Sequence, residues 1–302
     1  MRGIAIEALD APSFPRMPNS VRVIAPASTS NLGSGFDTLG LAVNLYSQIT
    51  LTRTRSKVKR AAVPAIVTEA ADLFFRRAHK SPFNFDLTIK GDIPVARGLG
   101  ASGALRAGVV AGLNALANAK LSIDRLLEMV TELEGHPDNA SPALLGGCTV
   151  SGRVIEEVRC LRFSVSPRLK LVTLIPNFRV ETEVARRLIP QTFSKADTAH
   201  ALNRAALITA AFASKNYEAL RGLFDDRMHQ PYRRPLVPQL DAVIRAGEKA
   251  GAIGGFLSGS GSAIICLALE NGVQIAKAMQ RELPDSDVKM LRADNRGLRI
   301  LS

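Results

Sequence analysis

The fold is decided by a glycine-rich stretch that leads directly into a helical pattern, Ile93-Pro94-Val95-Ala96-Arg97-Gly98-Leu99-Gly100-Ala101-Ser102-Gly103. Residues 84–90 before it alternate between polar and apolar side chains, which is typical of a strand. After it, Leu105, Val109 and Leu113 recur at helical spacing and predict one apolar face. The sequence therefore predicts a strand, a glycine loop and a helix in succession.

The predicted helix begins at the loop, so its unpaired N–H groups and the positive end of its dipole face the loop. Gly98, Gly100 and Gly103 allow a ligand to approach the backbone closely, and no Asp or Glu stands in the first turn. Such a position suits a phosphate. An ordinary turn remains the alternative. The loop is not a Walker A motif, because no Gly-Lys-Ser/Thr follows. A dinucleotide fingerprint has this glycine spacing but needs a different strand context.

Composition limits the classes of protein to consider. The chain has 302 residues, of which 46% are hydrophobic and 5% aromatic, and the formal net charge is +12. The Lys and Arg residues are scattered, and the two short clusters at 53–60 and 76–80 have no aromatic neighbours for stacking on bases. We therefore interpret the charge as solvated surface that also suits a small anionic ligand, and we expect no nucleic-acid partner.

The sequence contains no apolar run of membrane-spanning length and no secretion signal at its N-terminus. Cys148, Cys160 and Cys266 are odd in number and lack metal-ligand spacing, as expected of small buried residues in a reducing compartment. We predict a cytoplasmic protein without a membrane partner. The oligomeric state stays open, with a homodimer as one possibility.

Strand and helix patterns mix without a regular βαβ repeat, which predicts an α+β fold. Three prolines in residues 1–20 predict an irregular N-terminal arm. After the glycine loop at 254–262 we expect a strand, a helix and a last strand. The other predicted elements are strands at 21–25, 41–52, 84–90, 148–151, 158–165 and 169–175, and helices at 66–78, 123–134, 183–188, 199–213, 217–224 and 237–250.

Two polar segments are open to two interpretations. Residues 26–37 form a predicted loop with one carboxamide and one carboxylate, and could be a binding loop or an ordinary turn. Residues 134–139 close a helix and open an Asp/Asn-rich turn. Glu134 could hold a hard cation such as Mg²⁺, which usually takes one or two carboxylates plus phosphate oxygens. The alternative is a helix end, with Gly135 as cap and Pro137 as stop.

Two later segments could hold anions. Residues 229–234 carry adjacent arginines in a predicted loop, which could hold a phosphate or carboxylate through two parallel hydrogen bonds or simply lie on the surface. Residues 254–262 are a second glycine loop after a predicted strand. Two such loops in one chain favour a phosphate-handling enzyme.

Together and in this order, the five segments resemble the GHMP kinase superfamily. Residues 94–103 are similar to its signature, Pro, three residues, then Gly-Leu-Gly-Ser-Ser-Ala; Ser102 is kept, while Ala101 and Gly103 are replacements. Within the superfamily, the chain resembles the homoserine kinase family from about residue 21 to the C-terminus. That narrower resemblance is carried by residues 30–42, 134–147, 182–190 and 229–233.

The resemblance implies a two-lobed α+β fold, with an N-terminal lobe like ribosomal protein S5 and a ferredoxin-like C-terminal lobe. It places the arm at 1–20, the ATP-binding lobe at 21–152 and the C-terminal lobe at 153–302, with the acceptor site between the lobes. It implies ATP-dependent phosphorylation of the side-chain hydroxyl of L-homoserine, with Mg²⁺, giving O-phospho-L-homoserine for threonine biosynthesis.

The resemblance also assigns site residues. The ATP phosphates would be held by Pro94, Val95, Ala96, Arg97, Gly98, Leu99, Gly100, Ala101, Ser102 and Gly103, and Mg²⁺ by Ser102 and Glu134. Homoserine would be surrounded by Asn31, Asp37, His136, Asn139, Arg186 and Arg233, of which Asp37, Asn139, Arg186 and Arg233 are the catalytic candidates. Residues 65–67 are Ala-Ile-Val, where the family often has Asn-Leu-Val near the adenine.

The chemistry agrees with these roles. Asp37 suits the ammonium or hydroxyl group of homoserine, and the arginines suit its carboxylate. Phosphoryl transfer needs mainly positioning and charge stabilisation, so no strong general base is required, and Asp37 or Asn139 would align the hydroxyl. The rival interpretations are another small-molecule GHMP kinase, acting on mevalonate or a sugar, and a catalytically silent GHMP-fold binding protein, which Ala101 favours.

Overall fold

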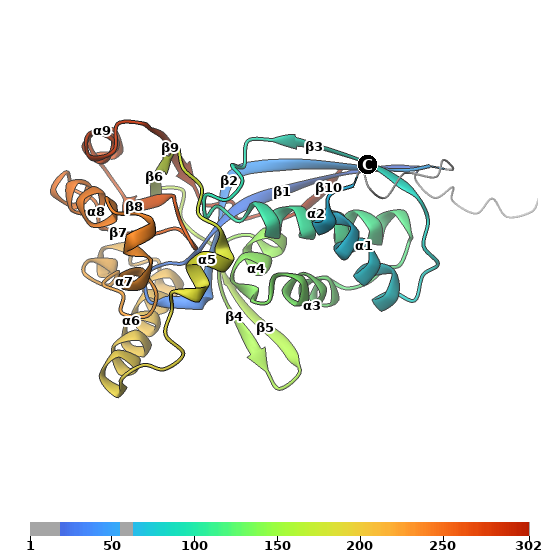
Figure 1. Ribbon diagram of the computed structural model, residues 1–302, viewed down its shortest axis with the longest axis horizontal. Coiled ribbons are helices and arrows are strands. Elements are labelled where there is room, and N and C mark those ends of the chain that lie inside the picture. Colours follow the sequence, from blue (N-terminus) through green and yellow to red (C-terminus); the bar gives the residue numbers. More distant parts are fainter. Residues whose placement is uncertain (1–18, 55–62, 302) are drawn as a thin grey trace, which may run out of the picture.

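The protein is described by a computed structural model that covers residues 19–54 and 63–301. The predicted arm at 1–20 and the basic cluster at 53–60 lie largely outside the described residues. Two antiparallel sheets, each covered by helices, form the two halves of the molecule (Figure 1). The predicted α+β, two-lobed fold is confirmed.

The first sheet has the order β10-β1-β2-β4-β5, with β3 paired to the far part of β2. Its two long strands follow from their alternation: Val21, Val23 and Ala25 are buried and Arg22 is exposed. The strand β2 is long enough to pair with β4 at 39–41 and with β3 at 47–53. The strands are β1 (Ser20–Asn31), β2 (Gly35–Arg53), β3 (Phe85–Gly91), β4 (Cys148–Val154), β5 (Glu157–Phe163) and β10 (Arg299–Leu301).

Helices α1 to α4 lie on one face of this sheet (Figure 1). Two glycines bring α2 close to the strands, because a Cβ at Gly108 would collide with Ile49 and one at Gly112 with Leu51. The helix can therefore sit directly on β2, and its N-terminus is fixed relative to the sheet. The helices are α1 (Ala65–Arg77), α2 (Ala101–Leu116), α3 (Ile123–Glu134) and α4 (Pro137–Leu145).

The second sheet has the order β7-β8-β6-β9, with α8 and α9 on one face (Figure 1). Successive side chains of β8 enter two cores: Ile265 joins the large core of the molecule, while Ile264 and Cys266 pack toward α8 and α9. Both faces of the sheet are thus buried. Its elements are β6 (Lys170–Pro176), β7 (Gly254–Leu257), β8 (Ile264–Ala268), β9 (Ser286–Arg292), α8 (Leu240–Lys249) and α9 (Gly272–Glu282).

Three further helices and two 3-10 turns complete the described chain: α5 (Thr182–Arg187), α6 (Lys195–Ser214), η2 (Tyr217–Leu220), α7 (Gln230–Arg233) and η3 (Arg234–Leu236). Among the described residues, no helix combines the length and apolar character that a membrane span needs. The predicted boundary between lobes at residue 152 stays a prediction. The strands β5 and β10 come later in the chain and pair within the first sheet.

The structure corrects several sequence interpretations. Pro137, which was interpreted as a helix stop, is the first residue of the helix α4. Proline is tolerated in the first turn of a helix, where its missing N–H is not needed. Most of the predicted loop at 26–37 is strand, because β1 runs on to Asn31 and only 32–34 turn. Residues 229–234 are not a loop but contain α7, and the predicted helix at 217–224 is a single 3-10 turn. A further strand, β10, follows the expected last strand.

We expect Phe256→Ala to lower the free energy of unfolding by about 3–5 kcal/mol, the usual cost of removing a buried aromatic ring. Phe256 is fully buried, and its ring centroid lies 5.2 Å from that of Phe224. Urea unfolding measures the change. Ile155→Ala is the control, because Ile155 is 93% exposed and its loss should change stability by no more than about 0.5 kcal/mol. Equal effects would contradict this description of the core.

Candidate active site

A cleft of about 560 Å³ brings together side chains from both halves of the molecule. Of the predicted site residues, only Pro94 and Gly103 do not line it. Those that do are Asn31, Asp37, Val95, Ala96, Arg97, Gly98, Leu99, Gly100, Ala101, Ser102, Glu134, His136, Asn139, Arg186 and Arg233.

The N-terminus of α2 opens into this cleft without a cap of its own. Gly100 is the N-cap residue in a left-handed conformation, with φ of 66°, and no side chain accepts from the first N–H groups. The first turn contains no acidic residue. These unpaired donors and the helix dipole suit an anion such as a phosphate group.

The first glycine loop is held by the end of β1 and by the second glycine loop. Ser28 N donates to Leu99 O over 3.2 Å, and Ser258 Oγ donates to Gly98 O over 2.7 Å. A Cβ at Gly98 would collide with Ser258 O, so only glycine permits this approach. The carbonyl groups of the loop are thus tied to the protein on its outer side. In the second loop, Ser258 and Ser262 are fully buried, whereas Gly259 and Ser260 line the cleft.

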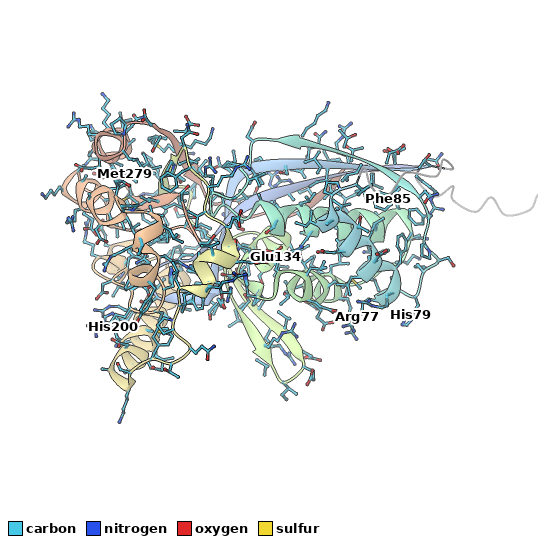
Figure 2. The ribbon with its side chains drawn as sticks, in the orientation of Figure 1. Arg77, His79, Phe85, Glu134, His200 and Met279 are labelled. Atoms are coloured by element: carbon cyan, nitrogen blue, oxygen red, sulfur yellow. The ribbon has the colours of Figure 1, made fainter. Side chains whose placement is uncertain are left out.

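The predicted metal ligands lie next to each other. Ser102 Oγ donates to Glu134 Oε2 over 3.0 Å, and the Glu134 side chain is only 5% exposed. Figure 2 labels Glu134 near the middle of the molecule beside α5, which lines the same cleft. A hydroxyl and a carboxylate are hard oxygen donors, so this pair fits a magnesium ion. Arg106, which sequence reasoning missed, also donates to Glu134, through Nη1 to Oε1 over 2.5 Å.

At the other end of the cleft, Asp37 and Arg186 form a bidentate pair between the two halves. Arg186 Nη1 and Nη2 donate to the two carboxylate oxygens of Asp37 over 2.9 and 2.8 Å. The hydrogen bond to Asp37 raises the pKa of Arg186. Both side chains are partly exposed, at 32% for Asp37 and 41% for Arg186, so a ligand in the cleft can reach them.

The backbone from the end of β1 to Asp37, near the start of β2, is strained. Asn31, Leu32 and Asp37 all have positive φ, at 71°, 44° and 54°. Such conformations cost of the order of 1–3 kcal/mol each and gather at functional sites. The Asn31 side chain stabilises the turn, because Oδ1 accepts from Asp37 N over 3.1 Å and Nδ2 donates to Gly259 O over 3.2 Å. Asn31 therefore positions Asp37.

The first turn of α4 adds a second carboxylate, Asp138, which was not among the predicted site residues. His136 Nδ1 and Asp138 Oδ1 form a short hydrogen bond, and Asp138 is almost fully buried. Burial alone would lower the pKa of His136, but the hydrogen bond and charge of Asp138, with a contribution from Asp37, leave that pKa raised. One ligand atom from each of these three side chains lies within 4.8 Å of the others. Together they suit a small cationic group.

Asn139, the next residue, is fixed between β1 and the first glycine loop. Ser28 Oγ donates to Asn139 Oδ1 over 2.9 Å, and Asn139 Nδ2 donates to Ser30 Oγ over 3.2 Å. Its side chain is so close to the loop that a Cβ at Gly100 would lie 3.0 Å from Asn139 Oδ1. Asn139 therefore lies against the first glycine loop and next in the chain to Asp138.

Arg233 is almost completely buried, with 2% of its surface exposed, yet it lines the cleft. Its Nη1 donates to Gly259 O over 2.9 Å and to His229 Nδ1 over 3.1 Å, and its Nε lies 3.4 Å from Ala185 O. Among the described residues, none accepts from Nη2, which stays available for a ligand. Burial, and then the charge of Arg186, lower the pKa of Arg233 to about 10, so the guanidinium remains charged at neutral pH.

Two buried residues next to Arg233, His229 and Asp226, were not among the predicted site residues. His229 Nε2 donates to Gly33 O over 2.9 Å, which leaves Nδ1 to accept from Arg233. Burial lowers the pKa of His229 to about 4, so the ring is neutral. Asp226 accepts from the backbone N–H groups of His229 and Gln230 over 2.8 and 2.7 Å and fixes the start of α7.

Phe36 joins the two arginines. The guanidinium carbons of Arg186 and Arg233 lie 5.4 and 5.5 Å from its ring centroid, and its ring stacks on His229 at 5.6 Å. Two guanidinium groups beside one aromatic ring are an arrangement that suits a carboxylate. Arg234 points elsewhere, pairing with Asp241 over 2.9 Å outside the cleft.

This fold is that of the GHMP kinases: the GHMP kinases N terminal domain model matches residues 65–147, and the GHMP kinases C terminal model matches residues 208–285. A protein named homoserine kinase from Clostridium botulinum (strain Alaska E43 / Type E3) is 35% identical over 292 residues, covering 92% of this chain and 97% of its own. The chain belongs to the homoserine kinase family.

Other similar proteins agree. A homoserine kinase from Carboxydothermus hydrogenoformans is 36% identical over 296 residues, covering 92% of this chain and 95% of its own. A crystal structure of homoserine kinase from Cytophaga hutchinsonii ATCC 33406 superposes with a TM-score of 0.85, covering 95% of this chain and 99% of that chain. Its sequence is 24% identical, so this likeness bears on the fold alone. The resemblance stated from the sequence is confirmed.

We expect the buried, neutral His229 to make the protein less stable in acid. Its pKa in the folded protein, about 4, is below the ordinary value of about 6.5, so the unfolded chain takes up this proton first as the pH falls. The contribution to stability is complete above about pH 6.5 and is lost as the pH approaches 4. His229→Gln keeps a donor and an acceptor but does not titrate there.

Urea unfolding at pH 7.5 and pH 4.5 measures this contribution as the difference between the two proteins. The loss of stability on acidification should be smaller in the variant, by up to a few kcal/mol. The same loss in both proteins would mean that His229 does not contribute to the acid sensitivity.

Proposed function

We propose that the protein transfers the γ-phosphoryl group of ATP to the side-chain hydroxyl of L-homoserine, giving O-phospho-L-homoserine for threonine biosynthesis. The observation that carries the proposal is the distribution of charge in the cleft. An anion cradle lies at one end, and paired carboxylates and guanidinium groups lie at the other. Homoserine is a zwitterion with a hydroxyl group, so it matches the second end and presents its hydroxyl to the first.

The ammonium and carboxylate groups of the substrate would replace the ion pair that Asp37 and Arg186 make with each other. The ammonium group would lie at the carboxylates of Asp37 and Asp138, whose ligand atoms are within 4.8 Å of each other. The carboxylate would lie at Arg186 and at Nη2 of Arg233. Because Asp37 and Arg186 already pair with each other, a zwitterion that replaces this pair leaves neither charge unpartnered.

The phosphate end would be held by the backbone of residues 98–103 and the N-terminus of α2. Ser102 and Glu134 would hold Mg²⁺, which supplies neutralising charge to the phosphate oxygens. Arg97 keeps the loop in place, because its Nε donates to Pro176 O over 2.9 Å and its own carbonyl accepts from Ala263 N over 3.0 Å.

The hydroxyl needs alignment more than deprotonation, since phosphoryl transfer depends mostly on positioning and charge stabilisation. Asn139 lies against the first glycine loop, next in the chain to Asp138, and is held rigidly by Ser28 and Ser30. Its carboxamide oxygen keeps a lone pair beyond the bond from Ser28 and would accept from the substrate hydroxyl. Asp37 would act through the ammonium group.

ADP release with different acceptors tests the function. We expect release to require L-homoserine and to stay at the background level with mevalonate, galactose or no acceptor. Stimulation by mevalonate or galactose would assign another small-molecule GHMP kinase. Nucleotide binding without any acceptor-dependent release would assign a silent binding protein.

We expect Arg233→Lys to raise the KM for homoserine by roughly 10- to 150-fold, the equivalent of one lost charged hydrogen bond, and to leave the KM for ATP nearly unchanged. A lysine cannot reproduce the planar guanidinium that reaches Gly259, His229 and the cleft together. Initial rates at varied homoserine and varied ATP measure both constants.

Arg234→Lys is the matched control, because Arg234 pairs with Asp241 outside the cleft. Its KM values should equal those of the unmodified protein. A larger effect at Arg234 would move the carboxylate site to the neighbouring residue. No effect at either position would leave Arg186 as the carboxylate ligand. Thermal melting of both variants separates a binding defect from a folding defect.

A further inference from the structure

Arg106 places a positive charge in the phosphate end of the cleft. It lies four residues after Ser102 on α2 and therefore on the same face of the helix. Long helical side chains lean toward the N-terminus of their helix, which here is the end that opens into the cleft. The Arg106 side chain is only 17% exposed and lines the cleft.

The Arg106 guanidinium is strongly bound on one side and incompletely bound on the other. Nη1 lies 2.5 Å from Glu134 Oε1, while Nη2 lies 3.5 Å from Oε2 of the exposed Glu69, a contact that contributes little. Nε is buried, and none of the described residues accepts from it. A buried charged donor without an acceptor is costly, so the guanidinium has capacity for an anion that the protein itself does not supply.

The pairing also affects the proposed metal site. Both oxygens of Glu134 are engaged, Oε1 by Arg106 and Oε2 by Ser102. A divalent cation at Ser102 and Glu134 would share one carboxylate with a guanidinium, and two cations at such short range repel each other. The guanidinium and the metal therefore compete for Glu134.

We propose that Arg106 is a phosphate-binding residue whose guanidinium pairs with Glu134 until a divalent cation takes that carboxylate, and then contacts the nucleotide phosphates. The proposal rests on the proposed function. It has a signature that a structural role lacks. Removal of Arg106 should strengthen metal binding, because the competitor is gone, and should weaken nucleotide binding, because a phosphate contact is gone.

Two measurements on the full chain test this signature. Mn²⁺ binding to the nucleotide-free protein is followed by electron paramagnetic resonance, and binding of β,γ-imido-ATP at saturating Mg²⁺ by calorimetry. For Arg106→Met we expect a Kd for Mn²⁺ lower by roughly tenfold or more, and a Kd for the nucleotide higher by roughly 10- to 150-fold. Arg106→Lys keeps the charge and should keep the Mn²⁺ affinity close to that of the unmodified protein.

Two control variants serve as references, and the melting temperature of each variant shows whether it is folded. Arg125→Met removes an arginine that pairs with Glu128 on the exposed side of α3 and should change neither constant. Glu134→Gln should abolish the Mn²⁺ binding. If Arg106→Met weakens both ligands together, or does not strengthen Mn²⁺ binding, Arg106 is a structural partner of Glu134 and the inference is wrong. If the unmodified protein binds no nucleotide, the proposed function itself is wrong, and this result differs from those that contradict the role of Arg106.

Discussion

The contact between the two glycine loops is the constraint on which the site depends. It joins the loop before α2 to the loop after β7, through Ser258 Oγ to Gly98 O at 2.7 Å and Ala263 N to Arg97 O at 3.0 Å. The approach is so close that no side chain fits at Gly98. These bonds hold the loop by its carbonyl groups, and the N-terminus of α2, which has no side-chain cap, borders the cleft. The same contact joins the two halves of the molecule at the side of the cleft that the two loops line.

Charge is arranged across this junction in a way that neither half could achieve alone. Asp37 comes from β2 in the first sheet, and Arg186 from α5 in the second half of the chain. Arg233 is buried, and no carboxylate among the described residues pairs with it: its hydrogen-bond acceptors are two carbonyl groups and the neutral His229. The cleft therefore keeps a positive charge for a ligand while the surrounding backbone dipoles stabilise it.

Much of this arrangement could be predicted from local patterns. The helix expected at 123–134 has those bounds, and the glycine loop before it in the chain leads into the helix α2, as expected. Periodicity works there because each helix presents one apolar face to the sheet. The helix α4 could not be predicted in the same way, because proline is compatible with both the end of one helix and the beginning of the next, and only packing decides between them.

The details of the site depended on contacts between distant residues. Ser30 and Asn139 are 109 positions apart, and no local pattern links them. The contact between Arg106 and Glu134 could not be predicted, because the helical pattern gives Arg106 a position on α2 but does not show which way its side chain points. Asp138 stood in a predicted motif but gained a role only when α4 placed it beside His136.

The strand β10 at residues 299–301 has a consequence for how the protein is made. It pairs with β1, so one of the last described segments completes the sheet that one of the first began. During synthesis, the ribosome releases β1 and β2 long before this partner emerges, and the outer edge of β1 has to wait. An unpaired edge is where a chain joins the wrong neighbour. The edge of β1 is therefore open to misassociation until residues 299–301 have emerged from the ribosome and paired with it.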